Sequence, residues 1–314
     1  MKIAIFGGGG FIGSAICDRL LADGHHLKVF ERPRIAPYRE FSIDEKVEWV
    51  TGDFSSPYVV ESFLDGVDVV LHLISSTLPR GSNEDVIFDV QTNLVTSLNL
   101  LNAMVVKKVK RIIFISSGGT IYGNPRYVPL DENHPTNPTV SYGITKLAIE
   151  KYLLLYQDLY DIRSIILRVA NPYGERQRSE TAQGAVGVFL SKAFHRQPIQ
   201  IWGDGSTIRD YVYVGDVADA FAKAINYDGE VSVFNISSGV GKSLNQVVAA
   251  AEEITGFHVK IEYLPPRSFD VPVNILNNSL AIKELGWMPK VKFFEGIKKT
   301  AAWIFEDLNK INAD

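Results

Sequence analysis

Apolar positions in the first half of the chain fall into short runs that alternate with segments of helical spacing. The runs cover residues 2–6, 27–31, 47–51, 67–73, 111–116 and 164–168, and their length is typical of buried β-strands. Helical spacing predicts helices over residues 11–22, 57–64, 86–105 and 142–160. Strands that alternate with helices in this way form a parallel sheet with helices on both faces. The pattern therefore predicts an α/β fold with a Rossmann-type, doubly wound parallel sheet.

The pattern becomes looser after about residue 170, where glycine and proline are denser. Helical spacing resumes at residues 186–196, 217–226, 244–255 and 294–308. We therefore expect a first domain over residues 1–170, with a returning segment near residues 206–235. Residues 171–314 are expected to form mainly a smaller C-terminal α/β domain that closes over a cleft.

The composition narrows the possible partners and locations. The 314 residues are 46% hydrophobic and 22% charged, with a formal net charge of −4. No basic stripe is present, which argues against a nucleic-acid partner, and no run approaches the roughly 20 apolar residues of a membrane span. The histidines are scattered, and the one cysteine, Cys17, lies in a predicted helix. We therefore expect no metal site, no internal disulfide, a buried thiol and a reducing, cytoplasmic location.

A glycine-rich segment, GGGGFIG at residues 7–13, follows the first predicted strand and opens the first predicted helix. Glycine permits a tight turn, close approach of the backbone to a pyrophosphate, and close packing of the helix on the strand. The helix N-terminus offers free N–H groups and the positive end of a dipole to phosphates. We therefore expect residues 1–170 to bind a dinucleotide, with contacts from Gly7, Gly10, Phe11, Ile12 and Gly13.

Residues at the ends of the next strands indicate which dinucleotide binds. Glu31 ends the second predicted strand, where a carboxylate accepts hydrogen bonds from the adenosine ribose and repels a 2′-phosphate, so NAD is favoured over NADP. Arg32 and Arg34 keep NADP open, because arginine binds phosphate. Asp53 follows the third strand and is either a contact for adenine or a turn aspartate. Further candidates for cofactor contact are Phe54, Leu73 and Ser116.

Tyr142 and Lys146 are four residues apart on a predicted helix, so their side chains lie on one face. A phenol has a pKa of about 10 in solution and is a poor base at neutral pH. A nearby ammonium group favours the phenolate and lowers that pKa. Tyr142 is therefore a candidate to take a proton from a sugar hydroxyl while hydride leaves the same carbon.

These features follow one another in the order found in a known enzyme family. After the glycine-rich segment come SS at 116–117, YG at 122–123, the Tyr142/Lys146 pair, and then NPYG at 171–174, WGDG at 202–205, RDYVYV at 209–214 and LGW at 285–287. Over essentially its whole length the chain resembles the extended short-chain dehydrogenase/reductase family. Within that family it is most similar to the NAD-dependent enzymes that act on nucleotide sugars, and above all to the UDP-glucose 4-epimerases.

The resemblance implies roles for individual residues. Tyr142 is implied to be the acid/base, Lys146 to bind the nicotinamide ribose and tune Tyr142, and Asn93 to support the active site from its helix. The two implied diphosphate ligands, Arg209 and Arg267, suit that task because a guanidinium group gives bidentate hydrogen bonds to phosphate. The implied substrate-binding residues are Thr120, Tyr142, Asn171, Arg209, Arg267 and Asp270.

The chain departs from the family pattern at Gly118, where relatives carry Ser or Thr, whose hydroxyl bonds the reacting oxygen. Ser117, which we include among the catalytic candidates, Thr120 or a water molecule can substitute. The family's dehydratases carry an acidic pair at the next two positions, which here are Gly119 and Thr120. A further departure is HLIS at residues 72–75, where relatives have alanine after the apolar residue.

The remaining chemistry needs only Tyr142, Lys146 and NAD. We therefore expect epimerisation at C4 of a UDP-hexose through a transient 4-keto sugar. An NAD(P)H-dependent nucleotide-4-keto-sugar reductase is the alternative enzyme, and a non-catalytic NAD-binding regulator is the alternative of another class. The resemblance also implies a homodimer formed by the helices at 86–105 and 142–160. Leu147, Leu153 and Leu154 give the second helix an apolar surface for it, although the same surface can belong to the core.

Overall fold

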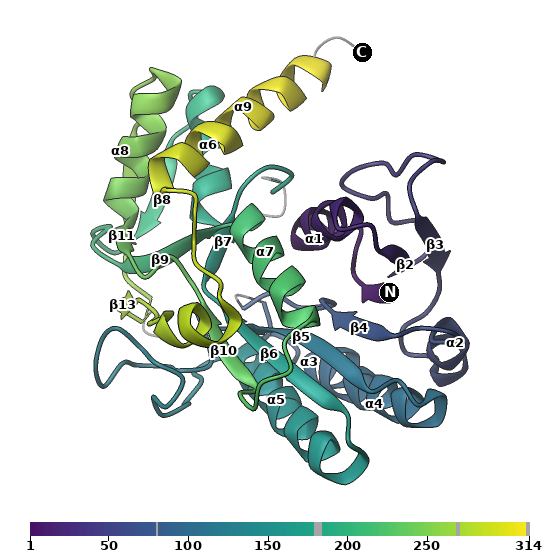
Figure 1. Cartoon of the computed structure of the whole chain (residues 1–314). Helices are drawn as coiled ribbons and strands as arrows, with labels where there is room; N and C mark the ends of the chain where they lie inside the picture. Colours follow the sequence, from purple (N-terminus) through teal and green to yellow (C-terminus); the bar gives the residue numbers. More distant parts are fainter. Residues whose placement is uncertain (80, 179–183, 268–270, 312–314) are drawn as a thin grey trace.

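A seven-stranded parallel sheet forms the centre of the larger part of the molecule (Figure 1). The computed structural model describes residues 1–79, 81–178, 184–267 and 271–311. The strand order is β10-β6-β5-β4-β1-β2-β3. The strands are β1 (Lys2–Phe6), β2 (His26–Glu31), β3 (Val47–Thr51), β4 (Val69–His72), β5 (Arg111–Ser117), β6 (Arg163–Val169) and β10 (Val233–Ile236). The predicted Rossmann-type sheet is confirmed, and β10 extends it from a segment late in the chain.

Helices cover both faces of this sheet because its strands carry apolar residues on both sides. Along β1, Ile3 and Ile5 pack on one side, whereas Ala4 and Phe6 pack on the other. The first side is covered by α1 (Phe11–Ala22) and α7 (Val214–Ile225). The second side is covered by α2 (Pro57–Phe63), α4 (Thr96–Lys107) and α5 (Ser141–Tyr160). The sheet thus separates two apolar cores, as the continuous apolar runs predict.

The rest of the chain forms a smaller lobe with its own apolar core. Its strands are β7 (Asn171–Tyr173), β8 (Ile199–Trp202), β9 (Ile208–Tyr213), β11 (Gly241–Ser243), β12 (Ile261–Leu264) and β13 (Val273–Asn274). Its helices include α6 (Ala185–Phe194), α8 (Leu244–Thr255) and α9 (Phe293–Ile311), while η3 (Ala281–Leu285) packs near α7 and β10. Because β9 leads directly into α7, the chain crosses from the smaller lobe back to the main sheet at Val214.

One predicted helix is interrupted. The spacing predicts a single helix over residues 86–105, but the structure has α3 (Val86–Asp89), a π-helical segment η1 (Val90–Val95) and α4. Side-chain hydroxyls explain the change, because Thr96 donates to the carbonyl of Thr92 at 2.7 Å and Ser97 donates to that of Asn93 at 2.6 Å. Such bonds compete with the regular backbone ladder and bend a helix.

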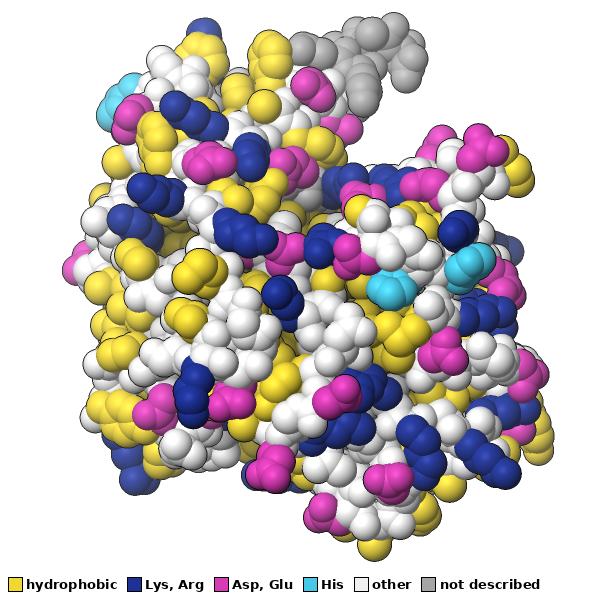
Figure 2. All heavy atoms as spheres, in the orientation of Figure 1, with side chains coloured by type: hydrophobic (Ala, Val, Ile, Leu, Met, Phe, Trp, Pro, Cys, Tyr) yellow, Lys and Arg dark blue, Asp and Glu magenta, His cyan; other side chains and the backbone are white. Residues whose placement is uncertain are grey.

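The surface shows no concentration of one charge on the face seen in Figure 2, where acidic and basic side chains are interspersed. Cys17 is buried as expected, and its thiol lies 3.6 Å from the carbonyl oxygen of Gly8. In the described part of the chain, every helix is too short or too polar to cross a membrane.

Candidate active site

The glycine-rich segment forms a tight turn between β1 and α1. Gly7 has φ of 91°, which favours glycine, and a side chain at Gly13 would collide with the carbonyl oxygen of Gly7. The space beside Gly10 is open, with Gly7 O at 3.7 Å as its nearest neighbour. No side chain caps the N-terminus of α1. This turn therefore combines an open approach with the N-terminal amides of α1, an arrangement that fits a pyrophosphate.

The second strand places Glu31 beside this turn. Its Oε1 accepts a hydrogen bond from Gly9 N at 3.0 Å, and burial raises the pKa of its carboxyl above the usual value. Arg32 is exposed. Asp53 is exposed too and accepts from the amide and hydroxyl of Ser55 at 2.8 and 2.7 Å, which favours the turn reading of this residue. Phe54 is a core side chain that packs on Phe6.

The start of α5 places Tyr142 and Lys146 on consecutive turns of one helix. The helix has no cap from its own preceding residue. Instead, Asn83 Oδ1 accepts from the Ser141 amide at 2.8 Å and Ser82 Oγ accepts from the Tyr142 amide at 3.0 Å. Two N-terminal amides of α5 are thus capped by side chains from the loop after β4. These hydrogen bonds fix the position of the Tyr142 backbone, from which its side chain extends.

Both members of the pair have strongly altered proton affinities. Burial lowers the pKa of Lys146 to about 7, against the negative charges of Asp89 and Glu150. Burial and the charge of Asp89 raise the pKa of Tyr142 to about 12, and a hydrogen bond with Ser75 opposes this rise. Desolvation of the phenol dominates the pKa of Tyr142 in this structure, so a lowering of that pKa by Lys146 stays a prediction. Lys146 Nζ donates to the carbonyl of Ile115 at 3.0 Å and lies 5.7 Å from the Tyr142 ring centroid.

Asn93 lies in η1 and bonds a carboxylate that the sequence did not single out. Its Nδ2 donates to Asp89 Oδ1 at 2.9 Å, and its Oδ1 accepts from Ser76 N at 2.8 Å. Asp89 is fully buried and also accepts from Thr145 at 2.7 Å, one residue before Lys146. Sequence reasoning missed Asp89 because two of its donors, Ser141 and Thr145, are 52 and 56 residues away in the chain.

The departure at Gly118 has a structural reason. A side chain there would collide with Leu276, which is fully buried, and would lie 3.1 Å from the carbonyl of Arg168. Among the two nearby hydroxyls, Ser117 is half-buried and Thr120 has a buried Oγ1 without a hydrogen-bond partner. An unpartnered buried hydroxyl costs free energy, so a ligand atom is a favourable partner for it.

Ser116 faces away from this loop. Its hydroxyl donates to Glu150, which also pairs with Arg168 at 2.7 Å. Arg168 donates to the Tyr122 hydroxyl at 3.0 Å, and that hydroxyl donates to Asn235 at 2.7 Å. The Ser116 side chain therefore belongs to a buried polar network across β5, β6, β10 and α5, so any contact with a cofactor would come from its backbone.

Three of the expected substrate ligands, Asn171, Arg209 and Arg267, lie on the smaller lobe. Asn171 begins β7 and donates to the carbonyl of Asp210 at 2.9 Å, and Arg209 lies on the neighbouring β9. The Arg267 guanidinium stacks on the Trp202 ring at 3.5 Å. Beside this stack lies a cavity of about 630 Å³, lined by Gly203, Asp204, Tyr263, Leu264 and Pro266. Asp270 lies outside the described residues.

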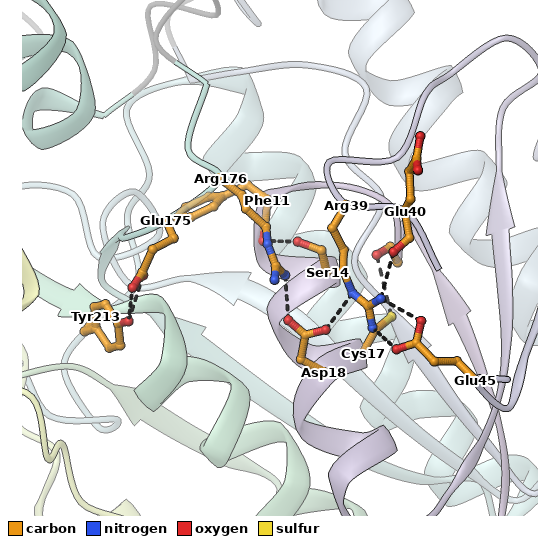
Figure 3. Close-up of polar contacts among 11 residues, drawn as sticks. Phe11, Ser14, Cys17, Asp18, Arg39, Glu40, Glu45, Glu175, Arg176 and Tyr213 are labelled. Atoms are coloured by element: carbon orange, nitrogen blue, oxygen red, sulfur yellow. Dashed lines mark hydrogen bonds and ion pairs between the residues drawn. The ribbon is translucent and has the colours of Figure 1, made fainter. Parts of the chain in front are cut away.

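A charged cluster joins α1, the helix that follows the glycine-rich turn, to the smaller lobe (Figure 3). Asp18 on α1 lies between two arginines, with Arg39 Nε at 2.7 Å and Arg176 Nη1 at 2.6 Å. Arg39 also pairs with Glu45. We call these four residues, Asp18, Arg39, Glu45 and Arg176, the Asp18 cluster. It connects the loop after β2 with the segment after β7.

Comparison with known proteins agrees with this geometry. Residues 3–237 match the sequence model of the NAD dependent epimerase/dehydratase family. A UDP-glucose 4-epimerase of Mycolicibacterium smegmatis is 35% identical over 309 residues, covering 96% of this chain and 97% of the relative. A dTDP-4-dehydro-6-deoxyglucose reductase of Escherichia coli is 31% identical, covering 95% of each chain.

The fold has solved counterparts. The crystal structure of a UDP-glucose 4-epimerase from Thermotoga maritima with UDP-glucose has a TM-score of 0.93 and 34% identity, and the match covers 98% of this chain and 100% of that one. The family match covers most of the chain. The chain therefore belongs to the NAD dependent epimerase/dehydratase family, and its cofactor is NAD.

Proposed function

We propose that this enzyme epimerises C4 of a UDP-hexose through a transient 4-keto sugar. The observation that carries the proposal is the Tyr142–Lys146 pair on the first turns of α5, together with the absence of an acid at Gly119 and Thr120 after β5. Loss of water or of a carboxylate from the sugar needs a further acid or base there, which Gly119 and Thr120 do not provide. Relatives and structural counterparts named as UDP-glucose 4-epimerases support the same reaction.

The reaction requires one proton and one hydride to leave the sugar and to return. Tyr142 takes the proton from O4, and bound NAD supplies the hydride acceptor and donor at C4. A protonated Lys146 favours the phenolate form of Tyr142 and binds the nicotinamide ribose. The Thr120 hydroxyl donates to the reacting oxygen in place of the one absent at Gly118. After the sugar turns over and presents its opposite face, Tyr142 returns the proton to O4.

Substrate binding is assigned to the smaller lobe. Arg209 and Arg267 bind the diphosphate, and Asn171 contacts the diphosphate or the sugar. The Trp202 ring fixes the plane of the Arg267 guanidinium beside the cavity, so less side-chain freedom is lost on binding. Anchoring at the diphosphate leaves the hexose free to rotate between the two hydride transfers. Residues 1–170 with the returning segment bind NAD, and residues 171–314 mainly bind substrate.

A 4-ketoreductase is the second candidate. The Escherichia coli relative named as a reductase favours it, and Arg32 is exposed where a 2′-phosphate would approach. The two reactions differ in stoichiometry, because an epimerase regenerates its cofactor each cycle whereas a reductase consumes NADH or NADPH. A non-catalytic regulator would show neither activity.

The test uses the purified enzyme without added cofactor, incubated separately with UDP-glucose, UDP-N-acetylglucosamine and UDP-glucuronate. Proton NMR of the anomeric and H4 signals should show the 4-epimer of one of them, and Tyr142→Phe should abolish it because phenylalanine cannot carry the proton. Lack of any epimer, even with NAD supplied, would contradict the proposal. Consumption of NADPH with a 4-keto-6-deoxy sugar nucleotide would then establish the reductase.

A further inference from the structure

Asp89 is a buried carboxylate directly beneath the catalytic turn of α5. It ends α3, it is fully buried, and it lies among neutral hydrogen-bond donors. An ionised carboxylate can accept about four hydrogen bonds, two on each oxygen. Oδ1 accepts from Thr77 and from Asn93. Oδ2 accepts from Ser141 and Thr145, and both of these distances are 2.7 Å. All four positions are therefore filled.

Each of the two donors to Oδ2 is the residue before one member of the Tyr142–Lys146 pair. Ser141 immediately precedes Tyr142, and Thr145 immediately precedes Lys146. A single carboxylate oxygen therefore binds consecutive turns of α5, and Oδ1 binds the η1 segment and the loop after β4. Asp89 also lies at the N-terminal turn of α5, where the helix dipole stabilises a negative charge.

None of these four partners neutralises the charge of Asp89. That charge raises the pKa values of both Tyr142 and Lys146. The other titratable groups close to the pair, His72 and Glu150, are neutral or paired with an arginine. Burial lowers the pKa of His72 on β4 to about 3, so it is neutral, and Glu150 on α5 pairs with Arg168 on β6. In the described part of the chain, Asp89 is therefore a buried anion close to Lys146 that forms no direct ion pair with an arginine.

We propose that Asp89 is a positioning residue that fixes the Tyr142–Lys146 turn on η1 and supplies the negative charge that keeps a proton on Lys146. This inference rests on the proposed function, because it assigns to Asp89 the geometry and the charge of that reaction's acid/base pair. A protonated Lys146 favours the phenolate of Tyr142, whereas the charge of Asp89 itself raises the pKa of Tyr142, so Asp89 affects the pair both directly and through Lys146.

The charge is tested by a measurement that needs no sugar. Lysine side chains of the NAD-loaded enzyme are labelled with ¹³C, and their NMR titration is followed, with Lys146→Met identifying the Lys146 signal. In Asp89→Asn the midpoint of this titration should move to lower pH by about one unit or more, because a neighbouring charge shifts a pKa by about 1–3 units. An unmoved midpoint would overturn the charge assignment, whatever reaction the enzyme catalyses.

The positioning is tested by turnover. Thr145→Val keeps the shape of the side chain and the charge of Asp89 but removes one hydrogen bond. Its kcat should fall about tenfold, with KM nearly unchanged because the diphosphate ligands lie on the other lobe, and the Lys146 midpoint should stay in place. In Asp89→Asn, by contrast, both limbs of the pH profile of kcat should move to lower pH. Unchanged kcat in Thr145→Val, or a profile that loses height without moving in Asp89→Asn, would overturn the proposal.

Discussion

At the scale of single residues, the site depends on which hydroxyl faces the reacting oxygen. Family relatives place that hydroxyl at the position of Gly118, where Leu276 now fills the space. Thr120 is the hydroxyl of this loop whose buried oxygen has no partner, whereas Ser117 is half-buried. A substrate oxygen would therefore supply the hydrogen bond that the buried Thr120 hydroxyl lacks.

Thr120→Val should lower kcat by about 10- to 100-fold, because a hydrogen bond to a charge-bearing oxygen contributes about 1.5–3 kcal/mol. Thr120→Ser keeps the hydroxyl and should retain most of the activity. The measurement is steady-state epimerisation followed by NMR. Ser117→Ala is the matched control, and a larger loss in Ser117→Ala than in Thr120→Val would assign the role to Ser117 instead.

At the scale of elements, the helices expected to form a dimer are apolar on their outer faces, but through other residues than predicted. Leu153 is buried in the core on the second side of the sheet, and Leu154 packs against that core. Leu147 packs against the core on the first side. Exposed apolar residues include instead Val86, Ile87, Phe88 and Val95 around α3 and η1, and Ile144, Tyr152, Leu155 and Leu159 on α5. Along α5 these four are spaced by eight, three and four residues, which places them on one face.

We propose that this face pairs with a second copy of the chain. Leu155→Glu should then convert a dimer to a monomer, because it would place a charge inside an apolar interface. Light scattering or sedimentation at micromolar concentration measures the mass. Tyr58→Glu, at a position 85% exposed on α2, is the matched control and should leave the mass unchanged. A monomeric mass for the unaltered protein would contradict the proposal.

The elements that the sequence predicts well are those whose apolar pattern is local. The six predicted strands, the glycine turn and the helix with Tyr142 all depend on neighbours within a few residues. The interruption at η1 depends on hydroxyls that bond back to carbonyls, and helical spacing looks the same with or without them. Asp89 and Leu276 were not predicted, because their importance comes from partners about 50 to 160 residues away.

At the scale of the whole molecule, the Asp18 cluster joins α1 and the loop after β2 to the smaller lobe (Figure 3). One arginine of the cluster, Arg39, follows Tyr38 in the chain. The amide of Tyr38 donates to the carbonyl of Gly9 in the glycine-rich turn at 2.8 Å. Arg176 comes from the segment that follows β7, the strand begun by Asn171. Asp18 therefore lies between the loop that contacts the glycine-rich turn and the segment that follows β7, and we propose that it couples the order of the two.

Asp18→Asn should weaken NAD binding by about two- to fivefold, since partly exposed ion pairs contribute about 0.2–1 kcal/mol each. Calorimetric titration with NAD measures the change, and it should shrink at high salt because screening already weakens these pairs. Asp23→Asn is the matched control, because that carboxylate pairs with Arg19 at the far end of α1. Equal effects from the two substitutions would contradict a special role for Asp18.

The contact between Gly118 and Leu276 also bears on how such an active site can change over evolutionary time. Serine at position 118 cannot be accommodated while Leu276 keeps its place, and a smaller residue at 276 opens a cavity in the core while glycine remains at 118. Either single change is expected to disturb the packing, whereas the two together would place a hydroxyl at position 118 without the collision. We expect this pair to show sign epistasis, which would keep a lineage on whichever hydroxyl it already uses.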